Sequence, residues 1–590
     1  MFFPSWLRFL KALPGQARTR RSPPARQRSR AYRPRLEPLE DRCLLNAGAL
    51  DPTFGNGAGY VTTALSSGGD SATRVLLQPS GNIVAAGATT VSVTTTTKKV
   101  TTTTTVPTFG AVTYNPDGRL DTAFGSGGIV RQQFVGQGAY RSVLFDAALE
   151  PTGGPGDAKI LLAGQDSAQG GLALMRLNPN GSLDTTFGGN GQVITQFQTS
   201  GNVSYERAEA VAVTSGGQIV ALGSDQSHTW LLARYNPNGS LDSTFGSGGK
   251  ATTVFSSSVA GFVAQVRAVA QQPDGKLVAV GDEYWSGVYH AVVVRYNANG
   301  SLDTSFGSGG IVMGGSLNQQ NRGAAVYPNA GTANDGKIVV SGVVFNGPAG
   351  GPYTLEGVVE RYNPDGSADT TFGNGTGYVL IGNPTTTKDA ANAVRIGSDG
   401  KPIFVGSHSD GGSSPYLLEV GRLNLDGSLD SSFGNGGLVK TAMLGNSSGW
   451  AVALQPDAKI VAAGYSYANG GKNNFAVARY LPSEPQIGLF TASPDPVTAA
   501  SSVTLTASNI TDTNPNSTIA QVAFYLDSNG NGQLEPGTDT LLGYGAQTSP
   551  GVWTFTFTVN SAPGTYTLVA QAEDSYGVFG DPLALTLTIQ

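Results

Sequence analysis

A six-residue motif, (Leu or Ala)-Asp-x-x-Phe-Gly, occurs seven times in this sequence and constrains the fold more than any other feature. Its phenylalanines are separated by 70, 63, 58, 61, 66 and 61 residues. A fixed long period of this kind indicates a repeat architecture, here one unit of roughly 60 residues copied in tandem. The motif phenylalanines are Phe54, Phe124, Phe187, Phe245, Phe306, Phe372 and Phe433.

The composition fits a large β-rich array. A chain of 590 residues is too long for one ordinary core, so we expect additional modules beside the repeats. It has 82 glycines, 39% hydrophobic residues and only 13% charged residues. Enough apolar surface is available to form packed cores, and the glycines favour many short strands joined by tight turns.

The charge is unevenly distributed. Residues 1–47 carry 11 Lys+Arg and 3 acids without a hydrophobic period, which predicts a disordered basic leader. The remaining body is acidic, which argues against a nucleic-acid partner. A single cysteine, Cys43, excludes an internal disulfide framework, and the absence of a run of 18 apolar residues predicts no transmembrane segment.

The best-formed repeat predicts four antiparallel strands. Residues 268–272 and 276–281 are largely apolar and flank Pro273-Asp274-Gly275, a sequence typical of a β-hairpin turn. Residues 291–297 form a third expected strand, and 311–313 a fourth. Four antiparallel strands in about 60 residues are consistent with one blade of a β-propeller.

The ends of the array complement each other. The second and third strands of the repeat each occur seven times, but the last copy stops at residue 482 without its Phe-Gly segment. The missing segment is present at residues 50–55. We therefore predict an all-β chain in which 48–484 form a seven-bladed β-propeller closed by its N-terminal segment. An open solenoid is the alternative, although it has no need of such complementarity.

Two other regions depart from the repeat. Residues 485–590 alternate apolar and polar residues between turn signals, which predicts an immunoglobulin-like (Ig-like) β-sandwich. Residues 89–105 are a Thr-rich insertion, for which an extended hairpin and a glycosylated or mobile stalk are both open.

Three stretches resemble known families. Residues 234–246 and 361–373 follow the RYNPDGSLDxxFG pattern and resemble the delta-60 repeat, which implies a tandem array on an exported bacterial protein and no particular activity. Residues 36–42 read LEPLEDR and resemble the N-terminal motif of exported planctomycete proteins, which implies that the leader 1–47 is an export signal and that the protein is sorted to the envelope, cell surface or outside. The FYLDSNGNG phrase at 524–532 resembles bacterial Ig-like surface modules.

The same phrase predicts a calcium site. Oxygen-bearing side chains at alternate positions, with a glycine at the sixth, suit a loop that wraps a hard cation. The bidentate glutamate of an EF-hand is absent, and Asp539 is its expected substitute. A polar hairpin turn remains the alternative. The candidate Ca²⁺ ligands are Asp527, Asn529, Asn531, Gln533, Glu535 and Asp539.

The motif aspartates recur in every repeat, so we expect them to cap turns and to pair with arginines that recur at the end of the third strand. Features that differ between repeats are better candidates for binding. Aromatic residues and all three histidines lie between the second and third strands, where loops of a propeller emerge on one face. Cross-strand packing at hairpin ends is the alternative. The candidate ligand-binding residues are His228, Trp230, Tyr284, Trp285, Tyr289, His290, His408, Tyr465 and Tyr467.

No catalytic residue is predicted. Residues 445–449 match G-x-S-x-G but precede a strand, whereas a hydrolase elbow enters a helix. We expect a monomeric, secreted or cell-surface protein, not an enzyme, whose propeller face binds a glycan or a surface protein in an adhesion role. Two alternatives remain open: an enzyme acting on extracellular polysaccharide, with acids and His228, His290 or His408 at the loop face, and a passive surface scaffold.

Overall fold

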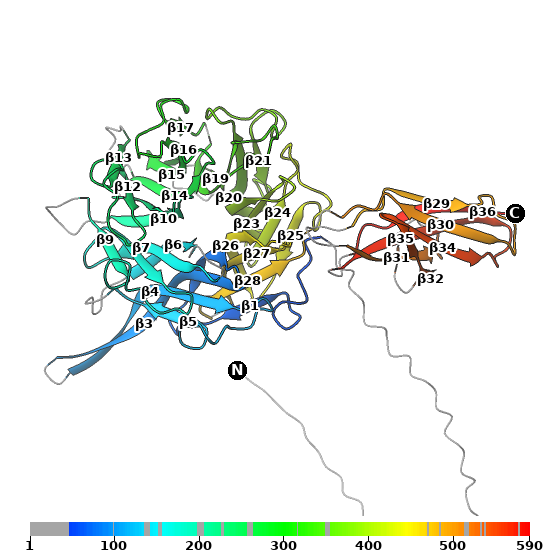
Figure 1. Cartoon of the computed structure of the whole chain (residues 1–590), viewed down its shortest axis with the longest axis horizontal. Helices are drawn as coiled ribbons and strands as arrows, with labels where there is room; N and C mark the ends of the chain where they lie inside the picture. Colours follow the sequence, from blue (N-terminus) through cyan, green and yellow to red (C-terminus); the bar gives the residue numbers. More distant parts are fainter. Residues whose placement is uncertain are drawn as a thin grey trace, which may run out of the picture. The chain divides into compact units, whose positions relative to one another are not determined.

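The computed structural model describes residues 47–97, 100–134, 142–151, 156–197, 206–225, 229–255, 263–315, 317–347, 354–468, 471–482, 485–512, 518–530, 534–535, 538–575 and 579–590. Over these ranges all regular secondary structure is β-strand, so the predicted all-β class is confirmed (Figure 1). No helix in the described ranges is long and apolar enough to cross a bilayer. The basic leader and its LEPLEDR motif lie outside the described residues.

Strands β2 to β25 form six consecutive four-stranded antiparallel groups, two of which are joined by a single parallel bridge between Leu355 and Lys388. The groups are β2 (Ser71–Leu77), β3 (Ile83–Thr97), β4 (Val100–Tyr114) and β5 (Ile129–Gln132); β6 (Ser142–Glu150), β7 (Lys159–Asp166), β8 (Leu172–Leu177) and β9 (Gln192–Thr195); β10 (Arg207–Val213), β11 (Ile219–Ser224), β12 (Thr229–Tyr235) and β13 (Lys250–Val254); β14 (Val263–Gln271), β15 (Leu277–Trp285), β16 (Val288–Tyr296) and β17 (Ile311–Met313); β18 (Gln319–Val326), β19 (Ile338–Asn346), β20 (Thr354–Tyr362) and β21 (Tyr378–Ile381); β22 (Lys388–Ile396), β23 (Pro402–Ser409), β24 (Leu417–Arg422) and β25 (Leu438–Thr441).

The last group of the array takes its fourth strand from the other end of the chain. β26 (Asn446–Leu454), β27 (Ile460–Tyr467) and β28 (Asn474–Tyr480) pair in order, and β1 (Tyr60–Thr63) then pairs antiparallel with β28. The N–H of Asp51 also donates to the carbonyl of Arg479 at 2.8 Å. The N-terminal segment thus supplies the strand that the last repeat lacks.

Hydrophobic cores lie between neighbouring groups. Seven clusters of buried residues each draw on two groups that are consecutive in the chain or, in one case, on the last and the first. That last cluster joins Val461 and Phe475 to Ile83 and Val112 and includes Phe54. Every group is therefore packed on two sides, and burial of this apolar surface is the main force that holds the array together.

A repeated arginine clamp links six of the seven groups to the next; the first group has Thr113 in place of the arginine. In one example, Arg361 donates through Nε to Asp369 at 2.6 Å and through Nη1 to the carbonyl of Leu425 in the next turn at 2.6 Å, and it lies 4.6 Å above the ring of Phe372. The predicted pairing of arginines with motif aspartates is confirmed. The clamp pairs are Arg176–Asp184, Arg234–Asp242, Arg295–Asp303, Arg361–Asp369, Arg422–Asp430 and Arg479–Asp51.

The Thr-rich insertion lengthens one hairpin. β3 and β4 stay in register out to the pairing of Thr97 with Val100, and Figure 1 shows this hairpin projecting beyond the other strands. The extended-hairpin interpretation is therefore the one the structure supports for the described residues of this segment.

The C-terminal strands form two further antiparallel sheets with one shared core. The core takes Leu505 and Trp553 from one sheet and Phe524 and Leu568 from the other, and all its residues lie between Ile487 and Ile589. The sheets are, in spatial order, β29 (Leu489–Ser493), β30 (Ser502–Ser508), β34 (Val552–Thr558) and β33 (Ala546–Ser549); and β32 (Thr540–Tyr544), β31 (Ile519–Leu526), β35 (Gly564–Asp574) and β36 (Leu583–Ile589).

Candidate functional site

The first strand of each group in the array carries a β-bulge at the same place. In β14 the register with β15 shifts between Val266 and Ala268, which leaves Arg267 without a cross-strand partner residue. The same shift occurs in β2, β6, β10, β18, β22 and β26. The seven bulged residues are Thr73, Phe145, Glu209, Arg267, Arg322, Asn392 and Trp450.

All seven bulged residues line one cavity. Bulges commonly redirect a side chain next to a functional site, and here they enclose a volume of about 400 Å³, which we call the bulge cavity. The first strands contact one another in chain order, and β26 contacts β2. The remaining lining residues are Arg74, Arg207, Gln265, Val266 and Gln320. A second cavity of about 300 Å³ shares Arg74, Arg322 and Asn392 with the first and continues along the same strands.

Most arginines of the bulge cavity have an acidic partner. Arg267 pairs with Asp282 at 2.9 Å, Arg207 pairs with Glu209 at 2.7 Å, and Arg74 pairs with Asp146. In each of these three pairs the carboxylate compensates the charge of the arginine.

Arg322 is different. Its hydrogen bonds go to two amide oxygens, Asn392 Oδ1 at 2.5 Å and Gln320 Oε1 at 3.3 Å, and its guanidinium lies 5.6 Å from the ring of Trp450. Among the described residues it forms no ion pair.

The electrostatic environment of Arg322 favours an anion. Burial, followed by the neighbouring charge of Arg267, lowers the pKa of Arg322 to about 10. Desolvation by surrounding protein atoms, followed by the nearby charge of Arg74, also lowers the pKa of Arg395, a residue that lines the second cavity but is itself exposed. A guanidinium with a pKa of about 10 is still charged at neutral pH. A negatively charged ligand group would therefore reduce the electrostatic repulsion between these arginines.

The aromatic hairpin predicted from sequence exists, but its side chains mostly pack on one another. Tyr284 and Trp285 end β15, and Tyr289 and His290 lie near the start of β16. Trp285 stacks on His290 at 4.3 Å, and Tyr284 lies 4.6 Å from Tyr289. Tyr289 also stacks on Phe345, a residue that sequence reasoning did not include, at 5.1 Å. This is the cross-strand packing named as the alternative; of the four, Tyr284 is classed as exposed, at 37%.

Two other predicted residues do not reach the surface. Trp230 in β12 is fully buried against Phe255, 5.1 Å away, because it points into the core between two groups. His408 in β23 is only 3% exposed. Both residues were predicted to lie on the loops between the second and third strands of their repeats. They lie in the strands themselves, which is why they are buried. Tyr465 and Tyr467 stack at 6.2 Å in β27, and His228 lies outside the described residues.

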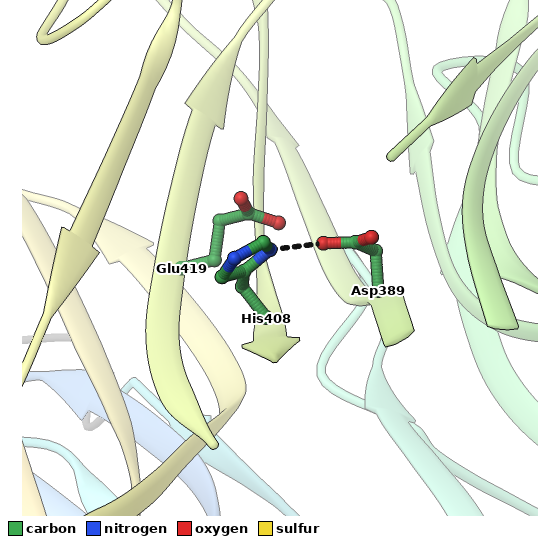
Figure 2. A group of neighbouring side chains, drawn as sticks. All are labelled: Asp389, His408 and Glu419. Atoms are coloured by element: carbon green, nitrogen blue, oxygen red, sulfur yellow. Dashed lines mark hydrogen bonds and ion pairs between the residues drawn. The ribbon is translucent and has the colours of Figure 1, made fainter. Parts of the chain in front are cut away.

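His408 belongs to a buried group of charged side chains (Figure 2). Its Nδ1 lies 2.6 Å from Asp389 Oδ1, and Glu419 is close enough that one ligand atom from each residue lies within 4.8 Å of the others. The Nε2 atom lies 3.0 Å from Asp410 Oδ1 and 3.1 Å from Lys440 Nζ. Burial and the nearby Asp389 raise the pKa of Glu419 to about 7, although His408 and Lys440 oppose this.

The predicted calcium loop is closed by hydrogen bonds among its described residues. Asp527 Oδ1 accepts the N–H of Gly530 at 2.7 Å, and Asn529 Nδ2 donates to Glu535 Oε2 at 2.6 Å. Asp539 accepts the N–H groups of Ser528 and Glu535. Asp527, Asn529, Glu535 and Asp539 therefore belong to one loop, while Asn531 and Gln533 lie outside the described residues.

Sequence reasoning missed the bulge residues because it began the first strand too late. In the best-formed repeat the expected strand started at residue 268, whereas β14 starts at Val263. Gln265 and Arg267 interrupt the apolar pattern, and both line the cavity. The sequence nevertheless contains a pattern that marks the bulge. In every repeat, a position whose residue type differs from repeat to repeat is followed two positions later by a small or apolar residue, as Arg267 is followed by Val269.

Comparison with protein families supports this architecture. The model described as "Domain of unknown function (DUF5122) beta-propeller" matches residues 156–187, 216–245, 272–306, 333–372, 397–433 and 455–483. The chain is a β-propeller-repeat protein. No curated protein matches it in sequence.

Solved structures resemble the chain only distantly. A Dyadobacter fermentans protein of unknown function is 10% identical, with a TM-score of 0.36 over 72% of this chain and 98% of that one. The PQQ domain of a Coprinopsis cinerea pyranose dehydrogenase is 11% identical, with a TM-score of 0.30 over 57% and 92%. A Penicillium chrysogenum α-L-arabinanase complexed with arabinobiose is 11% identical, with a TM-score of 0.26 over 46% and 91%. Likeness at this level says nothing about function.

Proposed function

We propose that this chain is an exported, non-catalytic binding protein in which residues 48–484 form a closed seven-bladed propeller that holds its ligand in the bulge cavity. The seven inter-group cores and the β1–β28 pairing support ring closure. In the same proposal residues 485–590 form an Ig-like module, the basic leader directs export, and the mature protein is secreted or attached to the cell surface.

The observation that carries this proposal is the set of seven bulges. The bulge itself is the same in every group, yet the side chain placed on it is different in almost every case: threonine, phenylalanine, glutamate, arginine, asparagine or tryptophan. A residue needed only for the fold would repeat with the fold. Side chains that vary at one shared, cavity-lining position are what a specific ligand site requires.

The chemistry of the cavity favours an acidic glycan. Arginine binds carboxylates through paired N–H groups, and Arg322 has no acidic partner among the described residues. The rings of Trp450 and Phe145 provide apolar faces against which a sugar ring can pack. A volume of about 400 Å³ is within the range of small-molecule sites. We therefore propose a uronate-containing saccharide as the ligand.

Calorimetric titration with a short oligogalacturonide tests this proposal, with the neutral oligosaccharide of equal length as comparison. We expect the acidic ligand to bind, and Arg322→Gln to weaken it by about tenfold or more through loss of a charge-assisted hydrogen bond. Arg119→Gln is the matched control, because Arg119 is a surface arginine whose side chain is 71% exposed. Equal binding of both saccharides, or equal loss in both variants, would overturn the assignment.

An assay for new reducing ends in the same titration mixtures distinguishes a binding protein from an enzyme that cleaves the saccharide. Outside the cavity, the neighbouring carboxylates of Asp389 and Glu419 are 1% and 0% exposed, which leaves no space for a sugar between them. Inside the cavity, Glu209 is held by Arg207 and by the hydroxyl of Ser224 at 2.7 Å. We therefore expect retention without cleavage; release of reducing ends would instead identify an enzyme.

A further inference from the structure

We propose that Asp389, His408 and Glu419 form a binding site for a divalent transition-metal ion, with zinc as the best fit. One nitrogen and two carboxylate ligands are a donor set that Zn²⁺ accepts, and a hard ion such as Ca²⁺ would need more oxygens. The inference is independent of the glycan proposal, because the three residues do not line the bulge cavity.

Glu419 supplies the strongest argument. It is 0% exposed, and neither of its carboxylate oxygens has a hydrogen-bond partner among the described residues. An ionised carboxylate in such a place is costly unless a cation compensates it. The nearby Lys440 compensates this charge only in part, since its Nζ contacts the imidazole of His408 at 3.1 Å and forms no ion pair with Glu419 among the described residues.

The position of Glu419 also departs from the repeat pattern. It lies three residues before the clamp arginine Arg422. In the other six groups the equivalent residue is small or apolar and buried, so the fold itself does not need a carboxylate at this place. Those residues are Gly110, Ala173, Leu231, Val292, Val358 and Ala476.

His408 is oriented as a metal ligand. Its Nδ1 faces Asp389 at 2.6 Å and its Nε2 lies 3.0 Å from Asp410. A metal ion replacing the proton on Nδ1 would leave Nε2–H to donate to Asp410, and metal-binding histidines commonly donate their second N–H to a carboxylate in this way. In that state Lys440 no longer donates to the ring.

The strands fix this arrangement. Asp389 and His408 face each other in the β22–β23 register, and Glu419 pairs with Gly406 across β23 and β24. Gly382 leaves room beside the cluster, since a Cβ at that position would lie 2.0 Å from Asp389 Oδ2. Ligands carried on paired strands are held more rigidly than ligands on loops.

Equilibrium dialysis of the metal-stripped full chain against ZnCl₂ tests the proposal, using protein without affinity-tag histidines and metal analysis of the retentate. We expect one tightly bound zinc per chain, a loss of affinity of tenfold or more in Glu419→Gln, and a smaller loss in Asp410→Asn. Glu360→Gln is the matched control, because Glu360 is a buried glutamate that accepts hydrogen bonds from Gln319 and Tyr362.

Two results would overturn the metal site: no saturable zinc binding by the folded wild-type chain, or the same affinity in Glu419→Gln as in the wild type. Cobalt substitution gives a second measurement that does not depend on stability. A Co²⁺ complex at this site would show ligand-field absorption that Glu419→Gln changes and Glu360→Gln leaves unchanged. Circular dichroism of each variant establishes that the chain remains folded.

Discussion

The clamp arginines and the bulge residues are both repeated features of the array, but they differ in what is repeated. At the clamp the chemistry is constant in six of the seven groups: an arginine, an aspartate and a phenylalanine recur in the same contacts. At the bulge only the backbone geometry is constant, and the side chains differ. In a repeat protein, constant chemistry indicates a structural task shared by every unit, and varied chemistry on a constant backbone indicates recognition.

Breaking a clamp should produce the largest loss of stability. In Arg361→Met we expect the free energy of unfolding to fall by about 2–4 kcal/mol, because the buried Asp369 loses one of its two cationic partners and keeps only Lys337, and because the hydrogen bond of Arg361 to Leu425 is lost. Urea denaturation followed by far-UV circular dichroism measures this change. Arg119→Met, at an exposed position, should change stability by no more than about 0.5 kcal/mol. A loss as small in Arg361→Met as in the control would refute the structural role.

The clamp should also govern acid sensitivity. Burial tends to raise the pKa of Asp430, but hydrogen bonds from Lys401 and Ser432 and the charge of Arg422 lower it to about 2. A lowered folded-state pKa adds stability above the unfolded value near 4, and that stability is lost as the pH falls toward 2.

We expect the pH-dependent part of this contribution to be about 2 kcal/mol. Urea denaturation of the wild type and Asp430→Asn from pH 2 to 6 measures it. The difference between the two chains should be greatest above pH 4 and should shrink toward pH 2. A difference that does not change with pH would contradict the ionic account of the clamp.

Calcium removal should have an intermediate effect, confined to the C-terminal strands. The loop of Asp527 and Asp539 predicts a site with a Kd near the millimolar range. At calcium about tenfold above such a Kd, we expect stabilisation of about 1.4 kcal/mol. Differential scanning calorimetry with calcium and with chelator measures it, and Asp527→Asn should abolish the shift. If chelator leaves the wild-type transition unchanged, the loop is a polar turn.

Changing a bulge residue should have the smallest effect on stability. Arg322 forms no ion pair among the described residues and lies close to Arg267, so Arg322→Gln should shift the free energy of unfolding by no more than about 0.5 kcal/mol. Urea denaturation under the conditions used for Arg361→Met gives a direct comparison. A loss comparable to that of the clamp variant would make the bulge residue structural as well.

The two regions were not equally predictable from the sequence. The period, the strand order within each repeat and the pairing of clamp residues such as Arg361 and Asp369 follow from local patterns that recur unchanged. The bulge cavity was missed because a bulge inserts one extra residue and so shifts the alternation of apolar and polar residues, which made Gln265 and Arg267 resemble the end of a loop.

The buried cluster was missed for another reason. His408 was recognised in the sequence, but as a loop residue, and its partners Asp389 and Glu419 come from two other strands. Local patterns do not give the register between strands, which brings these three residues together. Comparing equivalent positions across the repeats could have singled out Glu419, since the other six groups have no acid there.

The most direct test of the binding account is a crystal structure of the chain soaked with an oligogalacturonide. Our account predicts a saccharide in the bulge cavity, with its carboxylate on the guanidinium of Arg322 and its ring against Trp450. Saccharide density at the aromatic hairpin of Tyr284 and Trp285, with an empty bulge cavity, would contradict it.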